Sequence, residues 1–459
     1  MEKAGDDMKF KKRIFTASSP SRIITLVFAA LVLFGSGLLS LPFASRSGQS
    51  CGFLTALFTA CSAVCVTGLS LVDTYTQWSG FGQAVILLLI QVGGLGFMTI
   101  FTLFLLILRE RIGVKRRMLL QQSFGLNDMA GVIHLLHRVL YVTAITELGG
   151  AVILTLRFCR DYPIGSAVWL GVFHSVSAFC NAGFDLFGIS EPGSSLILYS
   201  NDWIVCLTVM TLVTVGGLGF FVWQDLYLNR KNPRHISVYT RLVLCISAVL
   251  VVGGALIFGA LEWNNPDTLG QKDIAGKLFG ALFQSVTTRT AGFSGIPQAK
   301  MTQPSQAISC IWMLIGGSSG STAGGMKTVT VGVLLLSAIR SARGKSRLTV
   351  FDRTINEGQI TMAGTIVTLM VSLSLFGAII ITIADRVDFL PALFEATSAL
   401  GTVGLTADLT PTLCIGSKLM LVLFMFFGRV GITTISMGFL LGERAEERFH
   451  YAETKLLIG

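Results

Sequence analysis

Long apolar runs alternate with short polar segments along the whole chain. The prominent runs cover residues 23–43, 81–108, 139–156, 203–223, 242–261, 306–316, 329–339, 361–384 and 419–441. Because crossing ~30 Å of hydrocarbon takes about 20 apolar residues, most of these runs can cross a membrane as single helices. The runs 306–316 and 329–339 are too short, and a segment rich in Gly and Ser separates them. The pattern predicts an all-α polytopic membrane protein with one interrupted helix.

The polar segments contain one phrase four times. Each copy begins with Phe and a polar residue and ends with Gly before Leu or Phe: FTACSAVCVTGLS (58–70), FHSVSAFCNAGFD (173–185), FQSVTTRTAGFS (283–294) and FEATSALGTVGLT (394–406). The closing residues, Gly68, Gly183, Gly292 and Gly404, are 115, 109 and 112 residues apart. Such regular spacing indicates an internally repeated fold. The third copy is one residue shorter between Phe and Gly, which predicts a local difference in its backbone.

Each copy closes a short apolar segment of about 12 residues, too short to cross the bilayer. The segment must therefore enter the membrane and return on the same side. Non-helical backbone at that depth is tolerated only where it is buried in protein or lines a water-filled path. The sequence thus predicts four parallel helix–pore-loop–helix repeats with pseudo-fourfold symmetry around one central pore. The predicted division is a cytoplasmic N-terminus at 1–22, repeats at 23–117, 118–231, 232–347 and 348–442, and a cytoplasmic tail at 443–459.

Charged residues are scarce and unevenly placed. They make up 13% of the chain, against roughly 25% in soluble proteins, and the formal net charge is +10. Lys and Arg gather in alternate loops, at 3–22, 109–138, 230–241, 340–353 and 444–455. This positive-inside pattern predicts a multi-pass protein of the cell membrane, embedded in the lipid bilayer, with both termini cytoplasmic. No nucleic-acid partner is expected, and the nine cysteines show no disulfide or metal-ligand spacing.

The closing glycines indicate a cation filter. Glycine adopts backbone conformations closed to other residues, so successive carbonyls can point at a common axis. A ring of carbonyls replaces the hydration shell of a cation, as in potassium-channel filters. We therefore predict that potassium binds to backbone carbonyls of the closing glycine of each copy and of the two residues before it. These are Val66, Thr67, Gly68, Asn181, Ala182, Gly183, Thr290, Ala291, Gly292, Thr402, Val403 and Gly404.

Polar side chains in the third copy are expected to hold its non-helical backbone. Arg289 has five fixed donors and is predicted to brace the filter by donating to neighbouring carbonyls. The hydroxyls of Thr287, Thr288 and Thr290 are predicted to satisfy backbone groups of the pore segment. The motif VGGLGF occurs at 92–97 and 215–220. Its small residues predict close helix packing.

The phrases SVSAFCNAGF, SVTTRTAGF and GGSSGSTAGGMKT and the terminal LLIG resemble the Ktr/Trk/HKT superfamily of cation transporters. The likeness covers nearly the whole chain and is closest to the Ktr membrane subunits, since the first repeat begins near residue 22. The resemblance implies potassium uptake by a homodimer with one pore per subunit. It also implies control by a cytosolic, nucleotide-binding regulatory ring (KtrA-like). No cofactor is expected in this chain, and sodium as an activator stays an open alternative.

The segment GGSSGSTAGGMKT (316–328) interrupts the second helix of the third repeat and resembles the intramembrane gate loop of this family. Deep in the last apolar run, Arg429 resembles the family's arginine beneath the filter, a charge that is costly in a membrane unless it is functional. Glu395 and the gate loop are its conceivable partners, and a structural salt bridge is the alternative. The predicted gate residues are Gly316, Gly317, Ser318, Ser319, Gly320, Ser321, Thr322, Ala323, Gly324, Gly325, Lys327 and Arg429.

Other interpretations of the chain carry less weight. The gate segment nearly fits a phosphate-binding loop, but Met326 intervenes and the flanks are apolar helices. A sodium-translocating member of the superfamily is the nearest alternative; serine at the position of Gly68 is associated with sodium preference there. From another class, a polytopic membrane lipid enzyme would need convergent acids, histidines or metal ligands, and only His134 and His137 form a close pair. The role of Glu147 stays open.

Overall fold

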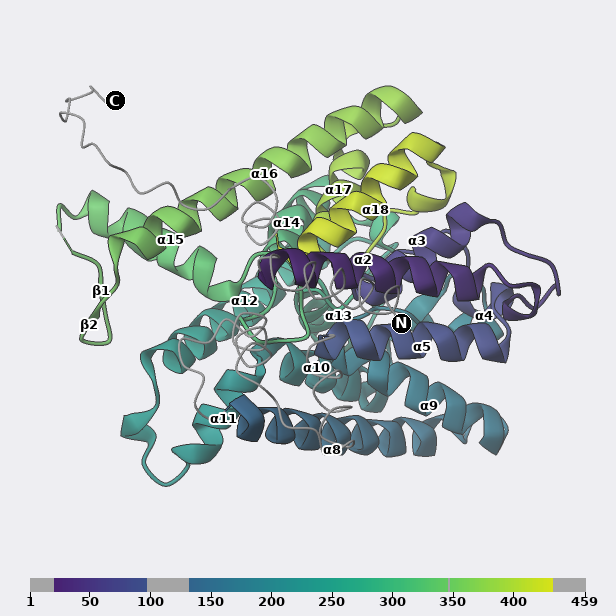
Figure 1. Ribbon diagram of the computed structural model, residues 1–459, viewed down its shortest axis with the longest axis horizontal. Coiled ribbons are helices and arrows are strands. Elements are labelled where there is room, and N and C mark those ends of the chain that lie inside the picture. Colours follow the sequence, from purple (N-terminus) through teal and green to yellow (C-terminus); the bar gives the residue numbers. More distant parts are fainter. Residues whose placement is uncertain (1–19, 97–131, 346, 432–459) are drawn as a thin grey trace, which may run out of the picture.

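The computed structural model describes residues 20–96, 132–345 and 347–431, and these form a bundle of helices (Figure 1). Four described helices are long and apolar enough to cross a membrane: Ser21–Leu39, Arg138–Phe158, Val238–Glu262 and Glu357–Asp385. They coincide with the runs at 23–43, 139–156, 242–261 and 361–384, so the predicted polytopic helical architecture is confirmed. The predicted tails and parts of the runs 81–108 and 419–441 lie outside the described residues.

The chain passes four times through a long helix, a short helix and a second helix. In the first pass these are α2 (Pro20–Leu39), α3 (Phe53–Val64) and α5 (Gly80–Leu95). In the second they are α8 (Val132–Phe158), α9 (Ile164–Phe179) and α10 (Trp203–Leu218). The third has α12 (Val238–Glu262), α13 (Ile274–Thr287) and α14 (Gln303–Leu314). The fourth has α16 (Glu357–Asp385), α17 (Phe389–Gly401) and α18 (Ile415–Val430).

Smaller elements join these helices. They include α4 (Thr74–Gln77), α11 (Phe220–Leu228), α15 (Thr328–Ala342) and an antiparallel hairpin of β1 (Thr349–Val350) and β2 (Arg353–Thr354). Short 3-10 turns lie at η1 (Pro42–Ala44), η2 (Phe187–Ile189), η3 (Ser195–Tyr199), η4 (Pro233–His235), η5 (Gln298–Lys300) and η6 (Thr410–Thr412). Capping side chains fix where several helices begin, because they satisfy amide groups that lack a helical partner. Ser79 and Asp202 do this for α5 and α10.

Helix packing follows one rule in all four passes. Each short helix packs against its own long helix: α3 on α2, α9 on α8, α13 on α12 and α17 on α16. The second helix of each pass then packs on the short helix of the next: α5 on α9, α10 on α13, α14 on α17 and α18 on α3. Because the last contact returns to the first pass, the packing closes on itself.

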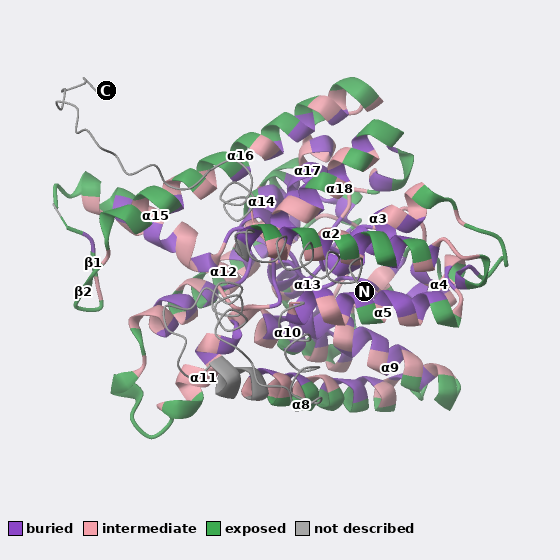
Figure 2. Cartoon of the chain, viewed as in Figure 1, coloured by how far each residue is buried: buried purple, intermediate pink, exposed green. Residues whose placement is uncertain are grey.

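Burial separates a centre that contains many hydroxyl groups from an apolar exterior. The short helices are largely buried, whereas the outward faces of long helices such as α8 and α16 are exposed (Figure 2). Those outward faces carry large apolar side chains, including Leu148 and Phe376. Apolar surface of this extent is what a protein presents to lipid rather than to water. The buried centre holds many Ser and Thr hydroxyls, and it is there that the four phrases lie.

The apolar run 203–223, expected as one helix, is broken. Helix α10 ends at Leu218, α11 begins at Phe220, and the two helices meet at 86°. Gly219 adopts φ +89° at the bend, a conformation that side chains other than glycine rarely take. The close packing expected of the motif VGGLGF is confirmed in both of its copies. An added Cβ at Gly93 would collide with the backbone of α3, and one at Gly216 would collide with the backbone of α9.

Candidate functional site

The four short helices α3, α9, α13 and α17 each lead into the closing glycine of one phrase (58–70, 173–185, 283–294 and 394–406, here called the glycine phrases). The glycines have positive φ: 94° at Gly68, 69° at Gly183, 79° at Gly292 and 95° at Gly404. Two residues earlier, non-glycine residues do the same: Val66 (56°), Asn181 (59°), Thr290 (63°) and Thr402 (51°). The residue between them does not, so the sign of φ alternates in all four phrases.

This backbone is unfavourable and must be held by its surroundings. Positive φ is a genuine outlier for β-branched residues such as Val66 and Thr402. Residues in such conformations cost roughly 1–3 kcal/mol each and are typical of functional sites. The cost is incurred at the same position of every phrase. Four independent loops would have no reason to share it, so the conformation belongs to a common structure that the phrases build together.

The closing glycines converge in a closed ring. An added Cβ at Gly68 would lie 3.1 Å from the Cα of Gly183, and one at Gly183 would lie 2.8 Å from the Cα of Gly292. The same measure gives 3.4 Å from Gly292 to Gly404 and 3.0 Å from Gly404 back to Gly68. Any side chain at these positions would therefore overlap the neighbouring phrase.

Carbonyl oxygens occupy the space between the glycines. At each closing glycine, a carbonyl oxygen of the next phrase in the ring fills the place that a Cβ would take. The oxygen comes from the residue just before that phrase's own closing glycine. These oxygens belong to Ala182, Ala291, Val403 and Thr67, in that order. Glycine is thus required twice, for its φ and for the close approach of a backbone oxygen.

Backbone hydrogen bonds tie each phrase to its helix. The amides of Thr67, Ala182 and Val403 donate to carbonyls five residues earlier, at 2.8, 2.7 and 2.8 Å. In the third phrase Ala291 donates to Thr287, four residues earlier, at 3.0 Å. The local difference predicted from the shorter third copy is therefore confirmed: the missing residue is removed from the turn that ends α13.

Hydroxyl groups brace the third phrase. Thr287 Oγ1 donates to the Phe293 carbonyl at 2.6 Å, and Thr288 Oγ1 donates to the Gln284 carbonyl at 3.0 Å. The predictions for these two residues are confirmed. The prediction for Thr290 is wrong: its Oγ1 accepts from the side-chain amide of Asn181 at 3.2 Å. Thr290 therefore links two neighbouring phrases instead of satisfying backbone.

In the second and fourth phrases, the polar residue after the Phe anchors the loop that leaves the glycine. The Glu395 carboxylate accepts from Thr406 Oγ1 at 2.5 Å and from the Ala407 amide at 3.0 Å. In the second phrase, His174 Nε2 accepts from the Leu186 amide at 3.2 Å. Glu395 is thus engaged in its own repeat and is not the partner of Arg429, which removes one of the two partners considered for that arginine. Because a hydroxyl and an amide of its own loop are within hydrogen-bond distance, the Glu395 carboxylate is satisfied without a distant cation.

The 316–328 loop lies against the glycine phrases. Its base is closed by the Gly316 amide, which donates to the Met326 carbonyl at 2.8 Å. Further along, Ser318 donates its amide to the Gly217 carbonyl at 3.0 Å, and Thr322 donates its hydroxyl to the Phe179 carbonyl at 3.1 Å. Gly324 packs directly on the side chain of Thr402. The loop therefore separates α14 from α15, as predicted, and touches the second and fourth phrases.

Arg429 fastens this loop to another repeat. Its guanidinium donates to the Thr322 carbonyl in the loop and to the carbonyls of Gly93 and Gly94 at the end of α5. A second buried cation, Lys327, donates to the Ala323 carbonyl at 2.9 Å. The contact with the loop confirms one of the two partners considered for Arg429. Among the described residues no carboxylate pairs with it, which removes the structural salt bridge there.

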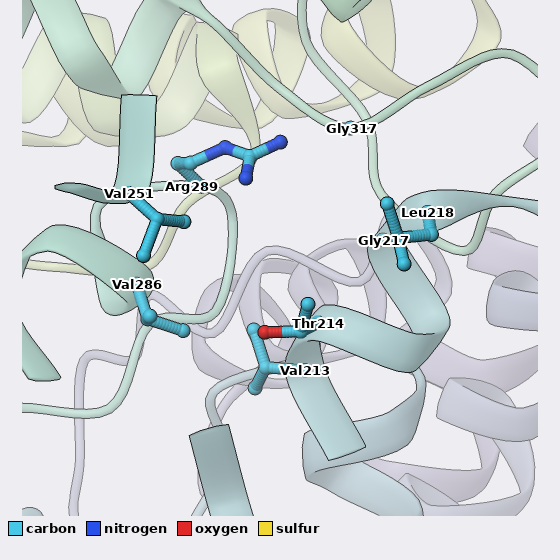
Figure 3. A pocket seen from close by; sticks show the side chains of 8 residues that line it. All are labelled: Val213, Thr214, Gly217, Leu218, Val251, Val286, Arg289 and Gly317. Atoms are coloured by element: carbon cyan, nitrogen blue, oxygen red, sulfur yellow. The ribbon is translucent and has the colours of Figure 1, made fainter. Parts of the chain in front are cut away.

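Arg289 does not brace the filter, so that prediction is wrong. One terminal nitrogen of its guanidinium donates to Ser247 Oγ at 3.3 Å, and the side chain points into a cavity of about 20 Å³ (Figure 3). The sequence places Arg289 next to Thr290, but the turn that ends α13 directs its side chain outwards from the phrase. Its environment is formed by α10, α12 and the 316–328 loop.

Two features of the site were missed or left open by the sequence. FGRVG at 427–431 is a third copy of the VGGLG pattern: Gly428 packs on the Leu400 carbonyl, and Gly431 has φ +91°. The shared G-x-x-G spacing could have revealed it. Glu147 is paired with Gln91, whose amide reaches both carboxylate oxygens at 3.1 Å. Glu147 thus joins α8 to α5 close to the second phrase.

Comparison with known proteins defines the class. Residues 3–446 match the TrkH family model, described as "Cation transport protein". The chain belongs to this family of membrane cation transporters, so the alternative of a polytopic lipid enzyme is wrong.

Two relatives resemble the chain over nearly its full length. It is 38% identical to the potassium/sodium uptake protein NtpJ of Enterococcus hirae, over 98% of this chain and 99% of that protein. It is also 38% identical to the Ktr system potassium uptake protein B of Bacillus subtilis, over 94% and 95%. Among solved structures, the potassium transporter TrkH of Vibrio parahaemolyticus has a TM-score of 0.73 at 18% identity, over 93% of this chain and 86% of that chain. This last likeness is one of fold.

Proposed function

We propose that this protein takes up potassium across the cell membrane through one central pore per subunit, lined by the four glycine phrases. The observation that carries the proposal is the closed ring of glycines, in which a backbone oxygen of each phrase lies against the closing glycine of its neighbour. Carbonyl oxygens at such a ring can replace the water lost by an alkali cation. Potassium would bind at the carbonyls of the twelve filter residues named from the sequence.

The 316–328 loop and Arg429 are proposed to gate this pore. The loop crosses the path next to the phrases and is held there by Arg429, Ser318 and Thr322. Two buried positive charges, Arg429 and Lys327, oppose the passage of a cation, because charges interact strongly where water is excluded. Conduction then requires the loop and these charges to move away from the axis.

Potassium is favoured over sodium for two reasons. Glycine closes all four phrases, and the relatives at 38% identity are named for potassium uptake, one of them for sodium as well. Sodium as an activator or as the transported ion forms the second candidate. By its likeness to a Ktr system protein, the chain is proposed to act as a homodimer with a cytosolic nucleotide-binding regulatory ring (KtrA-like). The basic loops support cytoplasmic termini.

Uptake in cells that lack their own potassium transport tests this function. Cells expressing the protein, with and without a KtrA-like subunit, should grow at low external potassium and accumulate rubidium. Sodium uptake alone would favour the sodium-translocating alternative. Failure to move either ion, in membranes where the protein is present and dimeric, would contradict the proposal.

A further inference from the structure

Arg289 borders the end of α10 at Gly217 and Leu218, and Arg429 donates to Gly94 at the end of α5. Arg289 is the residue immediately before the positive-φ residue of its phrase, a position held in the second phrase by Cys180. Cys180 packs on Gly94 of α5, whose added Cβ would lie 2.7 Å from its Sγ. Arg429 stands in FGRVG where Gly94 stands in VGGLG. Where α5 meets the second phrase, both positions carry small residues, Gly94 and Cys180. Arg429 and Arg289 are the residues that take these two positions in other repeats.

The two arginines differ in how well they are satisfied. Arg429 donates to three backbone carbonyls, one of them in the 316–328 loop. For Arg289 the hydrogen bond to Ser247 is at 3.3 Å, and its buried Nε has no partner among the described residues. A guanidinium has five donors, and a buried donor without an acceptor is unfavourable. The conformation described here therefore satisfies Arg429 and leaves Arg289 under-bonded.

The cavity at the tip of Arg289 borders acceptors that the loop now occupies. The guanidinium points towards the side of the cavity formed by Gly217, Leu218 and Gly317 (Figure 3). The carbonyl of Gly217 accepts from the Ser318 amide at 3.0 Å, and that of Leu218 accepts from the Ser318 hydroxyl. The cavity, about 20 Å³, is large enough for one water molecule or one methyl group. One nitrogen of the guanidinium can therefore move into it without displacing protein.

We propose that Arg289 is a positioning residue for the open state of the gate. When Ser318 leaves, the carbonyls at the end of α10 lose their donors, and Arg289 crosses the cavity and donates to them. Ser318 and Arg289 thus compete for the same acceptors, one in the closed arrangement and the other in the open one. The inference rests on the proposed gating role of the 316–328 loop and adds a residue that stabilises its withdrawn position.

Potassium flux into proteoliposomes, with the regulatory partner in its activating state, tests this competition. Arg289→Gln should lower flux about tenfold, the change expected when a two-state equilibrium loses roughly one hydrogen bond to a charged group. Arg289→Lys keeps a charged donor and should restore most of the flux. Val251→Leu leaves Arg289 intact but fills the cavity from α12, so it should also lower flux.

The same variants in a protein lacking residues 318–324 separate gating from other roles. Without the loop, Arg289→Gln and Val251→Leu should have no effect on flux, because no closed state competes. An equal loss in both backgrounds, or unchanged flux in the intact protein, would overturn the proposal. If Arg289→Gln does not fold, Val251→Leu decides the question. Failure of the gate itself is recognised separately, since the loop deletion alone would then leave flux and regulation unchanged.

Discussion

Replacing Gly292 by serine is expected to lower potassium-selective uptake by roughly one to two orders of magnitude. The new Cβ would lie 3.0 Å from the Cα of Gly183 and would press on the Val403 carbonyl, at a residue whose φ is +79°. Overpacking of this kind costs about 1–3 kcal/mol, which corresponds to a loss of roughly 5- to 150-fold in a rate that depends on the ring. The measurement is potassium and sodium uptake in cells without their own potassium transport.

Gly253→Ser is the matched control for this substitution. Gly253 lies in α12, has no heavy atom within 4 Å of an added Cβ and does not have positive φ. The control should transport as the wild type does. Gly68→Ser, which changes the ring from the first repeat, should lose selectivity as Gly292→Ser does. Normal potassium selectivity in a well-expressed Gly292→Ser protein would argue against a filter at this ring.

Deleting residues 318–324 is expected to raise potassium flux several-fold and to weaken control by the regulatory partner. The deletion removes Ser318 and Thr322, which hold the loop against α9 and α10, and it removes the loop carbonyl bound by Arg429. The obstruction proposed for this loop is then lost, while the hydrogen bonds that hold the glycine phrases to their helices are kept. Flux into proteoliposomes with and without the partner measures both effects.

A leak around the filter would give the same rise, and a double variant distinguishes the two. Adding Gly292→Ser to the deletion should remove the extra flux if ions still pass through the ring. Extra flux that survives in the double variant would show a path outside the phrases. Unchanged flux and unchanged regulation in the deletion alone would remove the gating role of the loop.

The features that could be predicted from the sequence are those fixed by local chain properties. Apolar length determined the long helices, and the repeated Gly marked the turns with positive φ, because a residue without Cβ is needed there. The interruption between α14 and α15 followed from a Gly- and Ser-rich segment that is a poor helix former. Each of these signals lies within a few residues of the element it specifies.

The sequence could not predict which distant groups a side chain meets. Thr290 bonds to Asn181 in another repeat, and Arg429 bonds to Gly93 and Gly94 from the first. Glu395 was one of two partners considered for Arg429 from its charge, yet it is satisfied by amide and hydroxyl groups of its own loop. The bend at Gly219 was likewise hidden, because the apolar run continues through it and the loop that packs against the bend lies about a hundred residues later.

Diffraction from crystals soaked in thallium or rubidium ions tests the central claim most directly, since the anomalous signal locates the ion itself. We expect ion density on the axis of the ring, surrounded by the backbone oxygens of Thr67, Ala182, Ala291 and Val403. Strong ion density elsewhere in the protein, with none between these four oxygens, would contradict the account.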